Sequence, residues 1–293
     1  MATKAKATTK SKAASSRKAP ARAAASAKVV KAKPAGRLAV ITPQALVAEA
    51  VGTFGLALAA LTAPADQPLL VGLALAVLLV GMMRVSGGHF NPAITFGLWA
   101  ANKLDWVKVP FYWVSQLIGA LAALMVLGQY NGNGSALDLS SFSTWDWRVF
   151  FVEFIGAALF LFGIVAVVKN VASDAGRALG IGLSLVAGLV VAGGLLTANA
   201  TREQTLVQSG KETTVSTTFA AQGAALNPAI AVAQTERDVK AINKSIAGES
   251  SAASEKKASH FTLSVILGSL LGAAAGANLY MLVTGMSWKK REL

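Results

Sequence analysis

The sequence contains no cysteine, and only 14% of its 293 residues are charged. The absence of cysteine excludes disulfides and thiolate metal sites. Its two histidines, His89 and His260, are too few for a histidine-based metal site. The chain also has no phosphate-binding glycine loop and no serine, histidine and acid in a catalytic order. We therefore expect no cofactor, no bound metal and no enzyme activity.

Apolar residues dominate the chain instead. Hydrophobic residues make up 54% of it, and its mean hydropathy is +0.54. Such a composition is typical of a membrane protein. Six stretches are long and apolar enough to cross a hydrocarbon core of about 30 Å. These predicted spans are residues 44–63, 68–83, 107–128, 149–168, 178–198 and 261–283.

The tripeptide Asn-Pro-Ala occurs twice. The two copies are Asn91-Pro92-Ala93 and Asn227-Pro228-Ala229. Proline suits the first position of a helix, because its missing N–H would be unpaired there, and asparagine suits the N-cap before it. Each copy therefore predicts a short helix, over 91–100 and over 227–235. Neither is long enough to cross a bilayer, which takes about 20 residues.

The two halves of the chain repeat each other. Glu49 and Gly52 in the first span match Glu153 and Gly156 in the fourth, as the two Asn-Pro-Ala copies match. Each half contributes three spans, so the second half must enter the membrane from the opposite side. The sequence therefore predicts an all-α membrane protein with six transmembrane helices and two re-entrant half-helices in an inverted repeat.

The paired half-helices have a chemical consequence. If their N-termini meet at mid-membrane, each end brings about half a positive charge. Asn91 and Asn227 would then offer side-chain NH2 groups to the oxygen of a passing solute, while the positive potential opposes cations. This suits a channel for small neutral molecules. A transporter is disfavoured, because no ionisable pair lies beside the motifs to couple a driving ion.

Five motifs together point to a known family. They are Glu49-x-x-Gly52-Thr53-Phe54, Ser86-Gly87-Gly88-His89-Phe90-Asn91-Pro92-Ala93, Tyr112-Trp113-Val114-Ser115-Gln116-Leu117-x-Gly119, Glu153-x-x-Gly156 and Asn227-Pro228-Ala229. In these motifs the chain resembles the aquaporin, or major intrinsic protein, family. The resemblance implies a pore for water and small neutral solutes in a lipid bilayer, assembled as a homotetramer. We expect a channel domain over 43–285 with halves 43–128 and 148–285, between tails at 1–42 and 286–293.

The chain departs from this family at the outer selectivity filter. In most members an arginine follows the second Asn-Pro-Ala and lines the filter, whereas this chain has Ile230 there. The resemblance places the other filter positions at Val71, at Leu189 or Gly188, and at Ala224. This filter would be apolar and without a fixed charge. Two outcomes stay open: a wide filter that passes water and larger neutral solutes, or a hydrophobic constriction that dewets.

Several polar residues are candidates for supporting roles. Glu49 and Glu153 are intramembrane acids, and their symmetric placement predicts that they accept hydrogen bonds from the loop before each half-helix. His89 is expected to fix the first loop or to offer a carbonyl to the pore, with pH gating as the alternative. The polar insert over 199–222, with Arg202 and Lys211, is a candidate source of a donor to replace the missing arginine.

The first 37 residues carry eleven lysines and arginines and no acid. We predict a disordered tail that binds anionic lipid, each basic residue near the surface adding about 1 kcal/mol. Nucleic acid is the alternative partner, although no aromatic is interleaved with the charge to stack on bases. By the positive-inside rule both termini are expected in the cytoplasm of a multi-pass plasma-membrane protein. A non-conducting membrane protein that acts by adhesion or through this tail is the alternative to a channel.

Overall fold

The computed structural model describes residues 41–132, 137–221, 223–248 and 257–286. Most of the predicted N-terminal tail (1–42) and of the predicted C-terminal tail (286–293) lies outside the described residues. The basic segment that we predict to be disordered, and to bind lipid or nucleic acid, also lies outside the described residues.

Among the described residues, six helices are long and apolar enough to cross a membrane, which confirms the six predicted spans. They are α1 (Pro43–Thr62), α2 (Pro68–Ser86), α4 (Lys108–Tyr130), α5 (Trp147–Asn170), α6 (Asp174–Gln208) and α10 (Leu263–Thr284). Proline opens α1 and α2. The side chains of Asp146, Ser173 and Thr262 cap α5, α6 and α10 by accepting first-turn N–H groups.

The two half-helices are α3 (Pro92–Ala100) and α8 (Pro228–Ala233). Both begin where the sequence predicts, at the proline of each Asn-Pro-Ala. The second is shorter than the predicted 227–235. Its chain turns to an extended conformation at Gln234 and enters β1 (Thr235–Arg237), which pairs antiparallel with β2 (Lys257–Ser259). Pairing with residues twenty or more positions away thus ends the helix.

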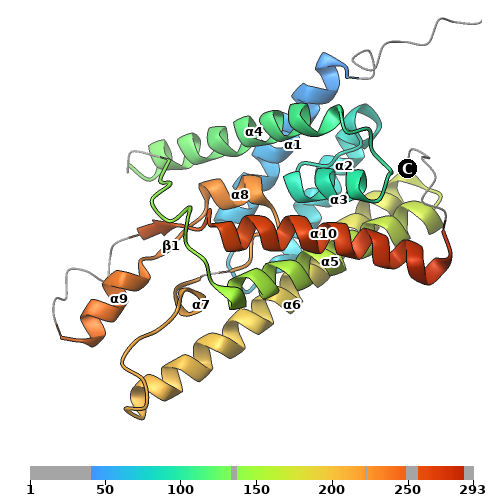
Figure 1. Ribbon diagram of the computed structural model, residues 1–293. Helices are drawn as coiled ribbons and strands as arrows, with labels where there is room; N and C mark the ends of the chain where they lie inside the picture. The colour runs from blue at the N-terminus through green and yellow to red at the C-terminus, as the bar shows by residue number, and fades with distance from the viewer. Residues whose placement is uncertain (1–40, 133–136, 222, 249–256, 287–293) are drawn as a thin grey trace, which may run out of the picture. The chain divides into compact units, whose positions relative to one another are not determined.

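The helices of the two halves pack in matching pairs (Figure 1). In the first half α4 packs on α1, and in the second half α10 packs on α5. Helices α2 and α6 pack together across the two halves. The half-helices also cross over, since α3 packs against α10 and α8 against α4. Each half therefore completes the core of the other.

Glycines allow the closest of these helix contacts. On α10, the positions of Gly268, Gly272 and Gly276 face the backbone of α5, and a Cβ at Gly276 would lie 2.0 Å from the carbonyl oxygen of Ala158. In the first half, a Cβ at Gly119 would lie 2.2 Å from the carbonyl oxygen of Ala50. Small residues at helix interfaces let backbones approach in a membrane, as the sequence predicts.

The predicted end of the fifth span, at residue 198, is wrong by ten residues, because α6 continues into the polar insert as a helix of 35 residues to Gln208. Thr201 and Thr205 donate their hydroxyls to carbonyls one turn back, which satisfies these polar groups within the helix. Glu203 is buried and accepts hydrogen bonds from Arg148 and Ser216, so this turn is tied to the start of α5 and to the following loop.

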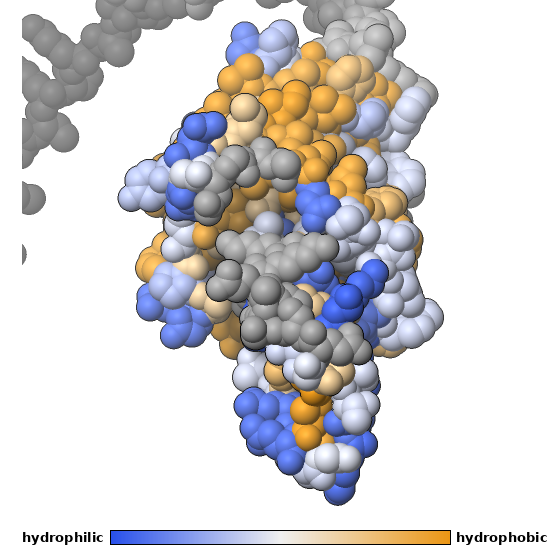
Figure 2. All heavy atoms as spheres, turned by 90° about the vertical axis from the view of Figure 1, so that its left-hand side faces the viewer, coloured by the Kyte–Doolittle hydropathy of each residue, from blue (hydrophilic) through white to orange (hydrophobic). Residues whose placement is uncertain are grey.

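One end of the helical unit carries the short elements. These are β1, β2, α7 (Thr217–Ala220), α9 (Val239–Ile246) and the last turns of α6, on the left in Figure 1. We call it the hairpin end. At the opposite end, the termini end, α1 begins and α10 finishes. Figure 2 looks onto the hairpin end, where hydrophilic and mixed residues cover much of the projecting end of α6 and hydrophobic residues gather toward the top of the view.

Candidate functional site

The two half-helices meet at their N-termini through reciprocal hydrogen bonds. Asn91 Nδ2 donates to the carbonyl oxygen of Leu226 at 2.8 Å, and Asn227 Nδ2 donates to that of Phe90 at 3.0 Å. The side-chain oxygens of the same asparagines cap their own helices by accepting from the amides of Ala93 and Ala229. Since an amide NH2 has two hydrogens, each asparagine keeps one donor that these contacts do not use.

The residue before each asparagine has an unusual backbone conformation. Phe90 has a φ of 48° and Leu226 a φ of 50°, in the left-handed region that few non-glycine residues adopt. These turns present the carbonyls of Phe90 and Leu226 to the asparagine of the opposite copy. The two loops are therefore strained in the same way, and something must hold each of them.

Two glutamates hold the strained loops. Glu49 Oε2 accepts the amide of Phe90 at 2.7 Å, and Glu153 Oε2 accepts the amide of Leu226 at 2.8 Å. The glycine three residues after each glutamate makes room for the side chain of the same loop residue. A Cβ at Gly52 would lie 2.1 Å from the Phe90 ring, and one at Gly156 would lie 2.6 Å from Leu226. The repeated Glu-x-x-Gly motif therefore seats each loop by its backbone and its side chain.

The first glutamate is surrounded by neutral donors. Besides Phe90, Glu49 accepts hydrogen bonds from Ser86 Oγ at 2.6 Å, from the amide of His89 at 3.0 Å and from Gln116 Nε2 at 2.8 Å. The Nδ1 atom of His89 lies 3.0 Å from the hydroxyl oxygen of Thr95, on the first half-helix. His89 is thus tied to the first loop through both its backbone and its ring.

The second glutamate faces a histidine instead. Glu153 Oε1 accepts the amide of Ala225 at 2.7 Å and lies 3.6 Å from Nε2 of His260. The other ring nitrogen of His260, Nδ1, lies 3.0 Å from Oε2 of Glu236 on β1. Burial alone lowers the pKa of His260, but the carboxylates of Glu153 and Glu236 outweigh it and raise this pKa to about 10. His260 is therefore a buried cation behind the second loop.

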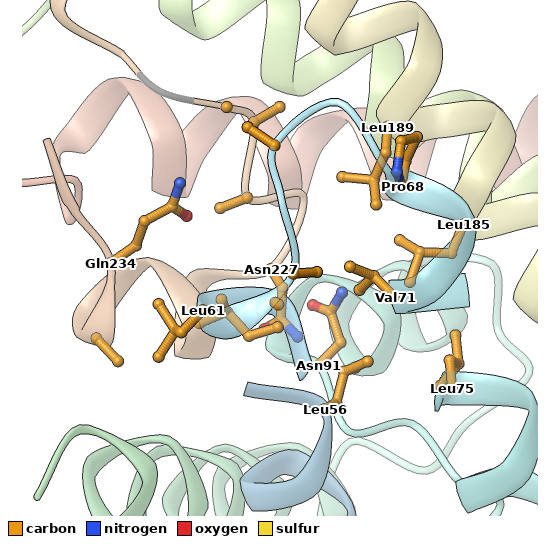
Figure 3. Close-up of a pocket in the computed structure, with 18 of the residues that line it drawn as sticks. Leu56, Leu61, Pro68, Val71, Leu75, Asn91, Leu185, Leu189, Asn227 and Gln234 are labelled. Carbon is orange, nitrogen blue, oxygen red and sulfur yellow. The ribbon is translucent and has the colours of Figure 1, made fainter. Parts of the chain in front are cut away.

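Two cavities adjoin the first loop at His89, and the first of them also contacts the asparagine pair. The hairpin-side cavity has a volume of about 520 Å³, and Figure 3 shows Asn91 and Asn227 near its centre. The termini-side cavity has a volume of about 430 Å³. Leu75, His89 and Phe160 line both, so the two cavities approach each other there. The termini-side cavity is also lined by the charged residues Arg84, Lys103, Asp105, Lys108, Asp174 and Arg177.

The family model for major intrinsic proteins matches residues 42–203, more than half of the chain. The chain belongs to the major intrinsic protein family. It is accordingly a multi-pass membrane protein.

Individual relatives match shorter stretches. The chain is 33% identical over 133 residues to a probable aquaporin, TIP1-2, of Oryza sativa subsp. japonica, which covers 44% of this chain and 50% of that protein. It is 45% identical over 56 residues to aquaporin Z of Photorhabdus laumondii, covering 19% of this chain and 24% of that one. The chain thus spans about half the length of the rice relative.

A solved structure supports the fold over most of the chain. The aquaglyceroporin from Plasmodium falciparum superimposes with a TM-score of 0.51, covering 82% of this chain and 96% of that one. The sequence identity is 20%, so this likeness concerns the fold alone. The predicted fold of six spans and two half-helices is confirmed.

All four residues that we assigned to the outer filter of this family member lie around one space. Val71, Leu189, Ala224 and Ile230 line the hairpin-side cavity. Gly188, the alternative to Leu189, does not line it. A Cβ at Gly188 would lie 2.7 Å from the carbonyl oxygen of Gly156, so this glycine serves the contact between α6 and α5.

The predicted source of a substitute donor is wrong. Arg202 and Lys211 are exposed, and neither lines the hairpin-side cavity. The polar side chains that line it, besides the asparagine pair and His89, are those of Asn131, Gln234 and Thr235. Sequence reasoning missed Gln234 and His260. Gln234 follows Ile230 by four positions, a helical spacing that could have drawn attention to it, whereas His260 has no match in the first half.

Proposed function

We propose that the chain is a passive channel for water and small neutral solutes. Its pore runs from the hairpin-side cavity, past Asn91 and Asn227, into the termini-side cavity. The observation that carries this proposal is the reciprocal contact of Asn91 with Leu226 and of Asn227 with Phe90. Through these contacts two helix N-termini lie face to face beside the hairpin-side cavity, and each asparagine keeps one amide hydrogen for a solute oxygen.

Selectivity in this proposal comes from two parts of the pore. The half-helix N-termini supply the positive potential that opposes cations. Val71, Leu189, Ala224 and Ile230 form an apolar outer filter without a fixed charge. Because Ile230 is shorter than the arginine of most family members, the filter in this proposal is wide rather than a constriction that dewets. Solutes somewhat larger than water therefore pass.

The same proposal covers orientation and assembly. The termini end faces the cytoplasm of a cell whose plasma membrane holds the protein. Lys103, Lys108, Lys169 and Arg177, in or beside the connectors at that end, support this orientation. The channel domain is residues 43–285, with halves 43–128 and 148–285. It assembles as a homotetramer in the bilayer, and the basic tail binds anionic lipid.

A blocking substitution tests the channel. Val71 is buried in the wall of the hairpin-side cavity, so Val71→Trp would fill the space through which solutes enter. Vesicles with the native chain are expected to shrink faster under an osmotic step than empty vesicles. Vesicles with Val71→Trp are expected to shrink at the rate of empty ones. Stopped-flow light scattering with water, glycerol and urea measures all three rates.

The matched control is Val77→Trp, on the same helix but 72% exposed on its outer surface. It should leave the native rates unchanged, because it adds the same side chain away from the cavity. If native vesicles shrink no faster than empty ones with every solute, the channel proposal fails. The non-conducting alternative then takes its place.

Restoring the missing arginine tests the wide filter. Ile230→Arg would place a long donor-rich side chain in the hairpin-side cavity, and we expect glycerol and urea permeability to fall several-fold while water permeability is kept. Ile230→Leu keeps the volume without the charge and should behave as the native chain. A rise in water permeability in Ile230→Arg would contradict a wide filter and indicate a native constriction that dewets.

A further inference from the structure

The hairpin-side cavity has a polar side chain that the four filter positions do not include. Gln234 directly follows α8, four residues after Ile230. Residues four apart lie on the same face of a helix, so Gln234 stands about one turn beyond Ile230 on the wall of the cavity. Figure 3 shows its amide directed into the cavity, on the side opposite Leu189 and Pro68.

The backbone of Gln234 is fixed on both sides. Its amide donates to the carbonyl oxygen of Ile230 at 3.0 Å, and its own carbonyl oxygen accepts the amide of His260 at 3.0 Å. The side chain of His260 lies in turn between Glu153 and Glu236. Gln234 therefore projects from a rigid support, as a residue that contacts a ligand needs to.

The side-chain amide of Gln234 is free to bind. Within the described part of the chain it forms no hydrogen bond, and it is only half-buried. By contrast, Asn91 and Asn227 each donate one N–H to the opposite loop, and the side-chain oxygen of each accepts an N–H of its own helix. Gln234 thus offers two N–H donors and one carbonyl acceptor to whatever enters the cavity.

We propose that Gln234 is a solute-binding residue at the outer end of the pore. It favours small neutral solutes that carry both a hydrogen-bond donor and an acceptor, such as urea or a small polyol. This inference rests on the proposed channel function. The guanidinium of the arginine found in most family members offers only hydrogen-bond donors and carries a full charge. The amide of Gln234 offers both donors and an acceptor and carries no charge. The apolar side chains of Val71, Leu189 and Ile230 contact the rest of the solute.

The test compares solute and water permeability in vesicles. Gln234→Met keeps the length and flexibility of the side chain and removes the amide. Because one hydrogen bond is lost, the ratio of urea to water permeability is expected to fall about 3- to 10-fold, and the glycerol ratio likewise. Gln67→Met is the matched control. Gln67 is exposed at the start of α2 and does not line the cavity, so its ratios should equal those of the native chain.

Gln234→Asn keeps the amide one methylene further from the solute, and a smaller fall is expected. It also serves if Gln234→Met does not yield folded protein, which size-exclusion chromatography of each variant establishes. Unchanged ratios in both variants, in vesicles where the native chain conducts, overturn this inference and leave the channel standing. Native vesicles that behave as empty ones overturn both.

Discussion

Replacing His260 by alanine is expected to destabilise the protein by about 3–5 kcal/mol, because it leaves two buried carboxylates without their cation. Glu153 is 1% exposed and Glu236 is 8% exposed, so both carboxylates would lose their partner in a region that solvent barely reaches. Glu153 also accepts hydrogen bonds from the amides of Ala225 and Leu226. Without His260, these contacts that hold the second loop are weakened. The thermal unfolding midpoint in detergent measures the effect.

The conservative variant His260→Gln separates charge from hydrogen bonding. Gln116 shows that a neutral amide can serve a buried glutamate in this fold, since it donates to Glu49 at 2.8 Å. We therefore expect His260→Gln to recover part of the stability that His260→Ala loses. Equal midpoints for His260→Ala and the native chain would contradict a cationic His260.

The charge of His260 also predicts a pH dependence. Burial by itself lowers the pKa of His260, but Glu153 and Glu236 raise it from 6.5 to about 10 in the folded chain. A raised pKa contributes stability that is fully present below pH 6.5 and is lost as the pH rises through 10. The native unfolding midpoint should therefore fall from pH 7 to pH 10. His260→Gln should lack this part of the fall, and parallel curves for the two proteins would refute the assignment.

The spans and both half-helix starts could be predicted, because local chemistry decides them. Length and hydropathy define a span, and a proline after an asparagine defines the start of α3 and of α8. The end of α8 could not be predicted in this way. Its sequence continues without a strong stop signal, and the helix ends where Gln234 accepts the amide of His260 and β1 pairs with β2.

The residues of the site also divide into those that the sequence predicts and those that it does not. Asn91, Asn227, Glu49 and Glu153 belong to the internal repeat, so one copy predicts the position of the other. His260 breaks the repeat, since in the first half Gln116 donates to the glutamate. The helical extension of α6 is likewise fixed by distant residues, because Arg148 and Ser216 bind Glu203. Contacts between segments far apart in the chain carry no local signal.

Gly276→Ala is expected to cause a large packing defect from a single methyl group. The added Cβ would lie 2.0 Å from the carbonyl oxygen of Ala158 and 2.8 Å from its Cα. Both atoms belong to the backbone of α5, which cannot rotate away as a flexible side chain does. Overpacking of a core typically costs about 1–3 kcal/mol and occasionally more, and a clash with backbone belongs at the upper end. The unfolding midpoint and the yield of monodisperse protein measure it.

Gly81→Ala on α2 is the matched control, since nothing lies within 4 Å of a Cβ at Gly81. Alanine favours a helix by about 1 kcal/mol over glycine, so this variant should be as stable as the native chain or slightly more so.

The defect at Gly276 should also reach the pore. Helix α5 carries Glu153 and α10 begins three residues after His260, so separating these helices pulls the cation from the carboxylate that seats the second loop. Gly276→Ala should therefore lose part of the alkaline dependence assigned to His260. A variant with the native midpoint and native pH dependence would show that α5 and α10 do not approach as closely as their glycines indicate.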